Sequence, residues 1–318
     1  MTNEKIKTCE YVSLKHPDKI CDQIADAILF AHLRKDKKSR VAVEVMGGHG
    51  HLTISGEITS KAKINIKKVV QSVVGRKMAI HIFVTRQSPF IAQGVDIGGA
   101  GDQGIMVGYA TSETKSMMPV EYEMARELCA AIYKKYPHDG KVQVTLNRKK
   151  VLAVVASFQN TKTKELALAA KKIMANLGKK YSRDISATKY LINPAGEWTL
   201  GGFDADSGLS GRKIVVDAYG PNVPVGGGSF AGKDLTKVDR SGALMARFLA
   251  VELLKKYKAR EVLVKLAYAI GKREPVMAVA EIDGQQVHLT GYDLTPKALA
   301  RRANLSLTSK RFSGIIEE

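Results

Sequence analysis

The sequence predicts an α+β protein made of three structurally similar modules. The order helix–strand–strand–helix occurs three times along the 318 residues, and the units begin roughly 100 to 120 residues apart. The composition, 45% hydrophobic and 25% charged, is that of an ordinary globular protein. We expect each module to be a sheet with helices on one face. The predicted modules are an N-terminal one at 1–98, a central one at 99–203 and a C-terminal one at 204–318.

The first unit begins with a helix whose apolar residues return every four positions. Ile20, Ile24 and Ile28 lie on one stripe of the segment 19–35. Two strand-like runs follow and are joined by a glycine turn. The remaining predicted elements are strands at 41–46 and 51–58, a helix at 63–74 and a strand at 79–84.

The same order of elements returns in the second and third units, which supports three related modules. The second unit is predicted as a helix at 121–136, strands at 142–146 and 151–157, a helix at 163–177 and a strand at 188–193. The third is predicted as a helix at 240–257, strands at 260–269 and 275–282, and a helix at 295–304.

Apolar runs and cysteines indicate the compartment. No stretch approaches the ~18 uninterrupted apolar residues that cross a bilayer, and the first residues lack an apolar signal core. Cys9, Cys21 and Cys129 are scattered and form no CxxC pair. A reducing, cytoplasmic setting without membrane attachment is therefore expected.

The formal net charge of +19 would attract polyanions, including nucleic acid. Many lysines, however, lie in short helical runs such as Lys171-Lys172, where solvated faces are expected. A nucleic-acid-binding protein would show steeply salt-sensitive binding, but the sequence contains no basic stripe interleaved with aromatic residues. We predict that nucleic acid is not a partner.

Glycine is concentrated in one part of the chain. Between Gly196 and Gly242 lie 11 of the 28 glycines, in a segment that reads as mostly irregular. Long irregular segments in compact proteins are usually functional or disordered. Apolar runs such as Lys213 to Val216 favour function.

Cations and carboxylates are interleaved with these glycines. Such a set matches a polyphosphate held with a divalent metal. Gly227 to Lys233 satisfies most of the phosphate-loop pattern GxxxxGK, but Asp234 replaces the Ser or Thr that would bind Mg²⁺ and no buried strand precedes it. A standard nucleotide-triphosphatase loop is therefore rejected. The charged residues are Arg212, Lys213, Lys233 and Lys237, with Asp206 and Asp239 at the edges.

Two further motifs have both a functional and an ordinary interpretation. His16-Pro17-Asp18-Lys19 precedes the first helix, whose N-terminus is a natural phosphate site. Asp18 or a neighbour could also simply cap that helix, and capping competes with binding Mg²⁺ for one carboxylate. The turn Gly99 to Gly104 contains Asp102, which could receive an ammonium or a ribose hydroxyl, and leads into an apolar strand at 105–109.

Taken in order, these segments resemble the S-adenosylmethionine synthetase family from about residue 8 to 275. Any single match could arise by chance, whereas the ordered set is specific. The matching segments are His16 to Lys19, Ser55 to Thr59, Gln93 to Asp96, Gly99 to Gly104, Ile192 to Pro194, Gly208 to Lys213, Gly226 to Asp234, Lys237 to Arg240 and Tyr268 to Gly271.

The resemblance implies three modules around a pseudo-threefold axis and active sites between two subunits. It implies a methionine adenosyltransferase of S-adenosylmethionine biosynthesis, within one-carbon metabolism. The enzyme would use ATP and L-methionine and then hydrolyse the triphosphate to phosphate and pyrophosphate. Two Mg²⁺ per site and K⁺ are implied as cofactors. A homodimer with shared active sites is expected, with a homotetramer as the alternative.

The resemblance also implies a role for individual residues. The catalytic residues would be His16, Arg212, Lys213 and Lys233. ATP would contact His16, Asp139, Lys141, Trp198, Asp206, Arg212, Lys213, Ser229 and Lys233, with Trp198 stacking on adenine. Methionine would contact Glu57, Gln93, Asp102, Asp206 and Lys237. Asp18 and Asp239 would bind Mg²⁺, Glu44 would be associated with K⁺, and Glu10 lies in the matching first segment.

The expected chemistry explains this choice of residues. A thioether sulfur that attacks C5′ of ATP has no proton to lose, so the reaction needs positioning and charge neutralisation rather than a general base. Some segments depart from the family pattern: the linker between Asp96 and Gly99 is shorter, Lys272-Arg273 replace a small apolar pair, and the C-terminus is short. These departures motivate an alternative, a nucleotide-binding paralogue with poor activity.

Overall fold

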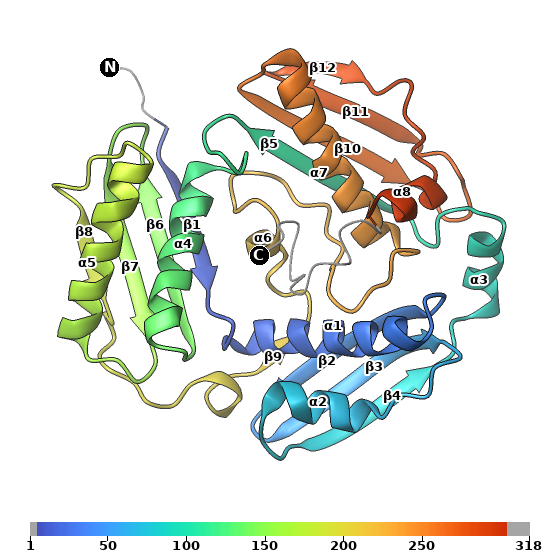
Figure 1. Ribbon diagram of the computed structural model, residues 1–318, viewed down its shortest axis with the longest axis horizontal. Coiled ribbons are helices and arrows are strands. Elements are labelled where there is room, and N and C mark those ends of the chain that lie inside the picture. Colours follow the sequence, from blue (N-terminus) through green and yellow to red (C-terminus); the bar gives the residue numbers. More distant parts are fainter. Residues whose placement is uncertain (1–4, 304–318) are drawn as a thin grey trace.

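The computed structural model describes residues 5–303 and contains three four-stranded sheets, each covered by helices on one face. Figure 1 shows the three layers arranged around a common centre, with α1, α4 and α7 on the sides that face it. Each layer has its own apolar core. The predicted α+β class and the three similar modules are confirmed by these sheets and helices.

The first layer has the strand order β4-β3-β2-β9, with β2 and β3 antiparallel and β3 and β4 parallel. Ile24 and Ile28 pack onto Val41, Val43 and Val45, because side chains four apart on a helix and two apart on a strand share a face. Its elements are α1 (Pro17–Lys35), β2 (Arg40–Gly48), β3 (His51–Thr59), α2 (Ile66–Val74), β4 (Ala79–Thr85) and β9 (Gly208–Leu209).

The second layer repeats this plan with the order β1-β6-β7-β8, whereas in the third, with the order β12-β11-β10-β5, the outer strand β12 is antiparallel to β11. The second contains β1 (Lys7–Val12), α4 (Val120–Lys135), β6 (Gly140–Leu146), β7 (Val151–Phe158), α5 (Thr163–Lys180) and β8 (Lys189–Ile192). The third contains β5 (Gly104–Thr111), α7 (Val238–Tyr257), β10 (Glu261–Tyr268), β11 (Met277–Ile282), β12 (Gln285–His288) and α8 (Pro296–Ala303). The remaining elements are α3 (Pro89–Asp96), η1 (Gly202–Asp204) and α6 (Ile214–Asp217).

Each sheet is completed by a strand from a distant part of the chain. β1 pairs with β6, β5 with β10, and β9 with β2. Each layer is therefore built from segments that are not contiguous in the sequence. The division at 1–98, 99–203 and 204–318 remains a proposal. The sequence did not predict β1, α3 or β12. The four residues of β12 are all exposed, so this strand lacks the buried alternation that identifies a strand in a sequence.

The glycine-rich segment 196–242 is mostly irregular, as expected. It contains only η1, the two-residue β9, the four-residue α6 and the start of α7. Figure 1 shows α6 near the centre of the molecule, between the three layers. Within residues 5–303, no helix combines the length and apolar character that a membrane span requires.

Candidate active site

The start of α1 is organised around a buried aspartate. His16 is the N-cap residue, and its Nδ1 accepts a hydrogen bond of 3.2 Å from the Asp18 amide. Pro17 occupies the first turn, where a missing N–H costs nothing. His16 rather than Asp18 therefore caps the helix, and the Asp18 side chain, only 1% exposed, remains available for other partners.

Cations and an amide surround the Asp18 carboxylate. Oδ1 accepts a hydrogen bond of 2.9 Å from the Leu209 amide, and Lys213 Nζ donates to Oδ2 at 2.5 Å. Arg212 Nε lies 3.6 Å from Oδ1. Burial alone would raise the pKa of Asp18, but the bonds from Lys213 and Leu209 outweigh it and lower this pKa. Asp18 is therefore an ionised carboxylate.

His16 is neutral in this setting. Burial, and then the nearby charge of Lys213, lower its pKa to about 4. Lys141 acts in the same direction, whereas Asp18 and Asp206 oppose it, so all four side chains lie within electrostatic reach of the imidazole. A neutral imidazole can donate one hydrogen bond without adding charge.

The end of β1 and the start of β6 bring a further pair to this region. Lys141 Nζ on β6 lies 2.7 Å from Oε2 of Glu10 on the neighbouring strand β1, two residues along the register. Asp139, directly before β6, accepts a hydrogen bond of 2.8 Å from the Gly202 amide. Burial raises the pKa of Asp139. Trp198 lies beside Gly201, since a Cβ added at Gly201 would be 2.8 Å from its ring.

A second charged group lies at the start of α7. Lys233 Nζ donates to Oδ2 of Asp239 at 2.9 Å. The glycines Gly226 to Gly228, which precede Lys233, include one that packs tightly on this pair. A Cβ added at Gly228 would be 2.2 Å from Oδ1 of Asp239. Lys237 Nζ is paired with Asp234, at 3.8 Å from its Oδ2, and not with Asp239. Predicted cations and a predicted Mg²⁺ ligand therefore meet here as well.

Ser229 lies between the group around Asp18 and the group around Asp239, because it directly follows Gly228, which packs against Asp239. A Cβ added at Gly211, which follows the Leu209 amide held by Asp18, would lie 2.7 Å from Cβ and Oγ of Ser229. Oγ of Ser229 is buried and has no hydrogen-bond partner among the described residues. A buried hydroxyl without a partner usually marks a missing ligand or water.

The predicted carboxylates on β2 and β3 lie beside these groups. Glu44 Oε2 accepts a hydrogen bond of 2.6 Å from the Ser210 hydroxyl. Glu57 pairs with Ala42 across β3 and β2, and Ala42 forms a β-bridge with Lys233. Glu44 therefore borders the glycine-rich segment, whereas Glu57 is one strand further away from it.

Gln93 and Asp102 are not brought into contact with the cations. Gln93 is exposed on α3, which lies at the periphery of the molecule (Figure 1). Asp102 is exposed, and its Oδ1 accepts from the amide of Gln103. Across the described chain, no hydrogen bond or ion pair joins either side chain to Arg212, Lys213, Lys233 or Lys237. Within the described chain, therefore, neither of these two residues predicted to bind methionine is bonded to the cations, although Gly101 and Gly104 beside Asp102 approach Thr236 and Asp239.

Sequence reasoning did not single out several residues that organise this region. Asp22 and Asp26 follow Asp18 at four-residue intervals, and Ser210 binds both Glu44 and the Val45 amide. The spacing of the three aspartates on a predicted helix was the signal that could have identified them. Among residues 5–303, no group of three or more His, Cys, Asp or Glu side chains could hold a metal ion by itself.

Three domain models of S-adenosylmethionine synthetase match the chain. The N-terminal domain matches residues 4–88, the central domain 97–198 and the C-terminal domain 200–311. The chain belongs to the S-adenosylmethionine synthetase family. The family resemblance seen in the sequence is thereby confirmed, and the predicted enzyme class, a methionine adenosyltransferase that forms S-adenosylmethionine, follows from it.

Relatives in this family are similar over nearly the whole chain. An S-adenosylmethionine synthase of Prochlorococcus marinus (strain MIT 9301) is 36% identical over 97% of this chain and 90% of its own length. One from Brachyspira hyodysenteriae is 37% identical over 93% of this chain and 88% of its own. A solved structure described as an unusual S-adenosylmethionine synthetase from Campylobacter jejuni superposes with a TM-score of 0.86 at 30% identity, covering 98% and 95% of the two chains.

Proposed function

We propose that this chain forms S-adenosyl-L-methionine at the site described above, with its glycine-rich segment holding the triphosphate of ATP. The observation that carries the proposal is the convergence of Arg212, Lys213 and Lys233 on two carboxylates, Asp18 and Asp239. Cations next to carboxylates on close-packed glycine backbone suit a polyphosphate that binds together with divalent metal. The family membership supports this assignment.

In the proposed reaction the sulfur of methionine attacks C5′ of ATP. The new S–C5′ bond forms as the C5′–O bond breaks, the sulfur becomes a sulfonium, and tripolyphosphate leaves with the bonding electrons. No proton moves in this step, so a neutral His16 beside the departing oxygen can donate a hydrogen bond without acting as a base. Arg212, Lys213 and Lys233 neutralise the charge that develops on the leaving group. Water then cleaves the tripolyphosphate into phosphate and pyrophosphate at the same cations.

Asp18 and Asp239 fit Mg²⁺ by their chemistry. Both are carboxylates on rigid helix starts, and one or two carboxylates together with substrate phosphates are the usual Mg²⁺ ligands. Glu44 is an oxygen donor suited to K⁺. Bound Mg²⁺ would supply further neutralisation of phosphate oxygens. Two Mg²⁺ per site, and K⁺, remain part of the proposal.

The other predicted contacts are assigned by position. Asp139, Lys141, Trp198 and Asp206 lie on the side of His16 and are proposed for ribose and adenine, with Ser229 on the phosphates. Glu57, Gln93, Asp102, Asp206 and Lys237 are proposed for methionine, although Gln93 and Asp102 make no hydrogen bond or ion pair with the cations among the described residues.

A homodimer with shared active sites would account for that lack of contact. Side chains alternate along β2, so Glu44 and Met46 share the face that α1 does not cover. Met46 and Phe83 on this sheet are 56% and 63% exposed. Large exposed apolar side chains that border a site mark an interaction surface. A second copy seated on this face would cover Glu44 and Glu57 and supply the missing methionine contacts.

The proposed function is tested by incubating the purified protein with ATP, L-methionine, Mg²⁺ and K⁺. We expect S-adenosylmethionine, phosphate and pyrophosphate in equal amounts. Nucleotide binding without product would favour the poorly active paralogue. The three buried cysteines form no disulfide among the described residues, in keeping with the proposed cytoplasmic location.

A further inference from the structure

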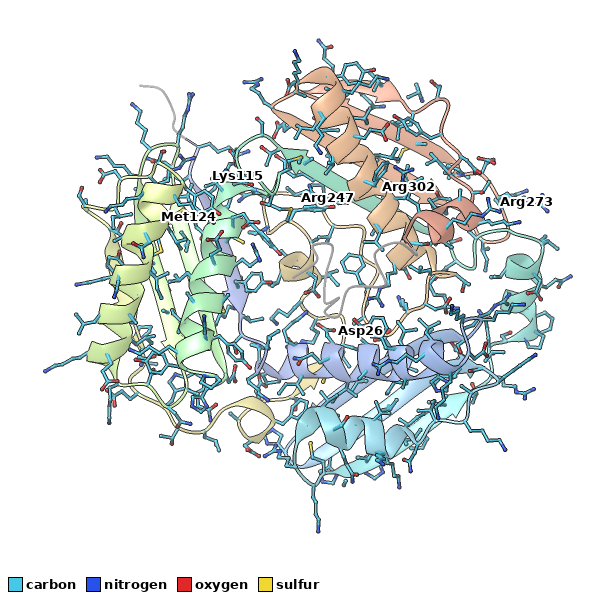
Figure 2. The ribbon with its side chains drawn as sticks, viewed as in Figure 1. Asp26, Lys115, Met124, Arg247, Arg273 and Arg302 are labelled. Atoms are coloured by element: carbon cyan, nitrogen blue, oxygen red, sulfur yellow. The ribbon has the colours of Figure 1, made fainter. Side chains whose placement is uncertain are left out.

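Three aspartates on α1 bind the two loops that carry the cations. One loop carries Arg212 and Lys213, and the other carries Lys233. Asp18, Asp22 and Asp26 recur every four residues and are all buried. Successive residues rise about 1.5 Å along a helix, so the carboxylates follow one another at intervals of roughly 6 Å along one side. Figure 2 shows Asp26 on the side of α1 that faces the centre of the molecule.

Each carboxylate accepts a backbone N–H from the glycine-rich segment. The donors are the amides of Leu209, Gly211 and Gly232, and each of the three bonds measures 2.9 Å. Gly211 directly precedes Arg212 and Lys213, Leu209 lies two residues before Gly211, and Gly232 directly precedes Lys233. The helix thus sets the distance between the loop that presents Arg212 and Lys213 and the loop that presents Lys233.

At two of these amides the backbone conformation and its close packing restrict where the loop can lie. Gly211 and Gly232 have φ values of 76° and 72°, a conformation that favours glycine. A Cβ added at Gly232 would lie 2.4 Å from the Val43 carbonyl and 2.9 Å from Ala25. The loops are therefore pressed against α1 and β2, and the aspartates determine where along the helix they sit.

Buried cations pair with the carboxylates of Asp22 and Asp26. Asp22 is paired with Lys19 at 3.0 Å, and Lys19 also contacts Asp217 at 2.6 Å. Asp26 is paired with Arg240 at 2.8 Å, and Arg240 in turn donates to the Lys233 carbonyl at 3.1 Å. A charged acceptor makes a stronger bond to an amide than a neutral one does.

We infer that Asp22 and Asp26 are positioning residues for adenosyl transfer. Acting through the Gly211 and Gly232 amides, they fix the spacing of Arg212, Lys213 and Lys233 around the triphosphate. Neither side chain has to touch the substrate. The inference rests on the proposed function, because that function makes the spacing of the cations matter. A displacement of about 1 Å in a catalytic group can lower a rate roughly 100-fold.

Asp22 offers the cleanest test, because Lys19 keeps Asp217 as a partner when Asp22 is changed. Asp22→Ala removes the acceptor for the Gly211 amide, whereas Asp22→Asn keeps an oxygen there. We expect the Ala variant to lose about 30- to 100-fold in kcat, with KM for methionine within about twofold. We expect the Asn variant to keep kcat within about fivefold of the parent. Asp26→Ala and Asp26→Asn should show the same order.

Amide hydrogen exchange on the protein without substrates gives a second measurement. Exchange at Gly211 should accelerate at least tenfold in Asp22→Ala and remain slow in Asp22→Asn, while the β2 and β3 core is unchanged. Asp36→Ala is the matched control. Asp36 lies at the other end of α1 and also accepts backbone amides, those of Lys38 and Lys61, far from the cations. The Asp36→Ala variant should have a lower free energy of unfolding and a kcat within about twofold of the parent.

A folded Asp22→Ala protein with parental kcat would overturn the inference, and so would equal losses in the Ala and Asn variants. If the Ala variant does not fold, the Asn variant decides: more than a tenfold loss of kcat contradicts a role carried by the amide. If the parent forms no S-adenosylmethionine, the proposed function fails, and the exchange at Gly211 still shows whether Asp22 holds the loop.

Discussion

Lys233 Nζ lies 2.9 Å from Oδ2 of Asp239, so a cation proposed for phosphate and a carboxylate proposed for Mg²⁺ neutralise each other. Lys213 and Asp18 form a second pair of the same kind. All four side chains are largely buried, and a buried charge without a partner is costly. A ligand that takes one member of a pair must therefore offer a charge to the other. MgATP supplies both charges at once.

The first prediction follows from these pairs. Mg²⁺ alone would have to displace two lysines without giving them an anion, so its affinity should be low. With a non-hydrolysable ATP analogue present, we expect Mg²⁺ to bind at least tenfold more tightly. Calorimetric titration of Mg²⁺ with and without the analogue measures this. Equal affinities, after correction for Mg²⁺ bound by free analogue, would contradict the coupling.

The second prediction concerns the lysines themselves. Lys213→Ala and Lys233→Ala each remove a cation proposed to neutralise the leaving triphosphate, and we expect kcat to fall by about 10²- to 10³-fold. Circular dichroism should show an intact fold. Lys172→Ala, on the exposed side of α5, is the matched control and should keep parental activity. Near-parental activity in both site variants would argue against the site.

The third prediction uses the close approach of Gly228 to Asp239. A Cβ at position 228 would lie 2.2 Å from Oδ1 of Asp239 and 2.5 Å from its Cγ, so Gly228→Ala must displace the carboxylate. We expect kcat to fall more than tenfold and the Mg²⁺ concentration for half-maximal activity to rise. Gly50→Ala is the comparison, since Gly50 has φ 83° with open space around it. It should cost about 1 kcal/mol of stability and leave kcat unchanged.

The repeated elements could be predicted from sequence because their burial patterns are local. Ile24 and Ile28 mark α1 by helical spacing, and Val41, Val43 and Val45 mark β2 by alternation. The pairing of β1 with β6 and of β5 with β10 joins segments more than 100 residues apart. No local pattern encodes such a pairing, so the exchange of strands between layers was not predicted.

The candidate site shows the same division. The chemistry of Arg212, Lys213 and Lys233 could be read from their residue types among glycines. Which carboxylate faces which cation could not, because Asp18 meets Lys213 across 195 residues. The choice of His16 over Asp18 as the N-cap depends on backbone geometry at a single residue. Both were left open by the sequence.

The fourth prediction concerns pH. The side chain of Asp217 on α6 is only 9% exposed. Its removal from water raises its pKa to about 7, while Lys19 opposes the shift and Asp22 adds to it. An acid whose pKa is higher folded than unfolded binds its proton more tightly in the folded state. Its contribution to the free energy of unfolding therefore falls as pH rises from about 4 to about 7, and is level above that.

Asp217→Asn removes this titration. As pH rises from about 4.5 to about 7, the free energy of unfolding of the variant should increase relative to that of the parent. Above about pH 7.5 the difference between the two should stay constant. Urea unfolding of both proteins at several pH values measures the difference. Glu165→Gln, an exposed change on α5, should show no such trend. A difference that is independent of pH would show that Asp217 stays ionised throughout.

The fifth prediction tests the surface proposed for the second subunit. Phe83 on β4 is 63% exposed, on the sheet that presents Glu44 and Glu57. Phe83→Asp would place a charge in the centre of an apolar contact, where an unpaired charge is costly. We expect sedimentation velocity to show monomers at concentrations where the parent is dimeric, with kcat at least tenfold lower because each site would lack its partner's residues. Leu168→Asp is the matched control, since Leu168 is 71% exposed on α5, outside this face. It should change neither mass nor activity. A dimeric and active Phe83→Asp protein would place the interface elsewhere, and this face would then not be the one through which a partner completes the methionine site.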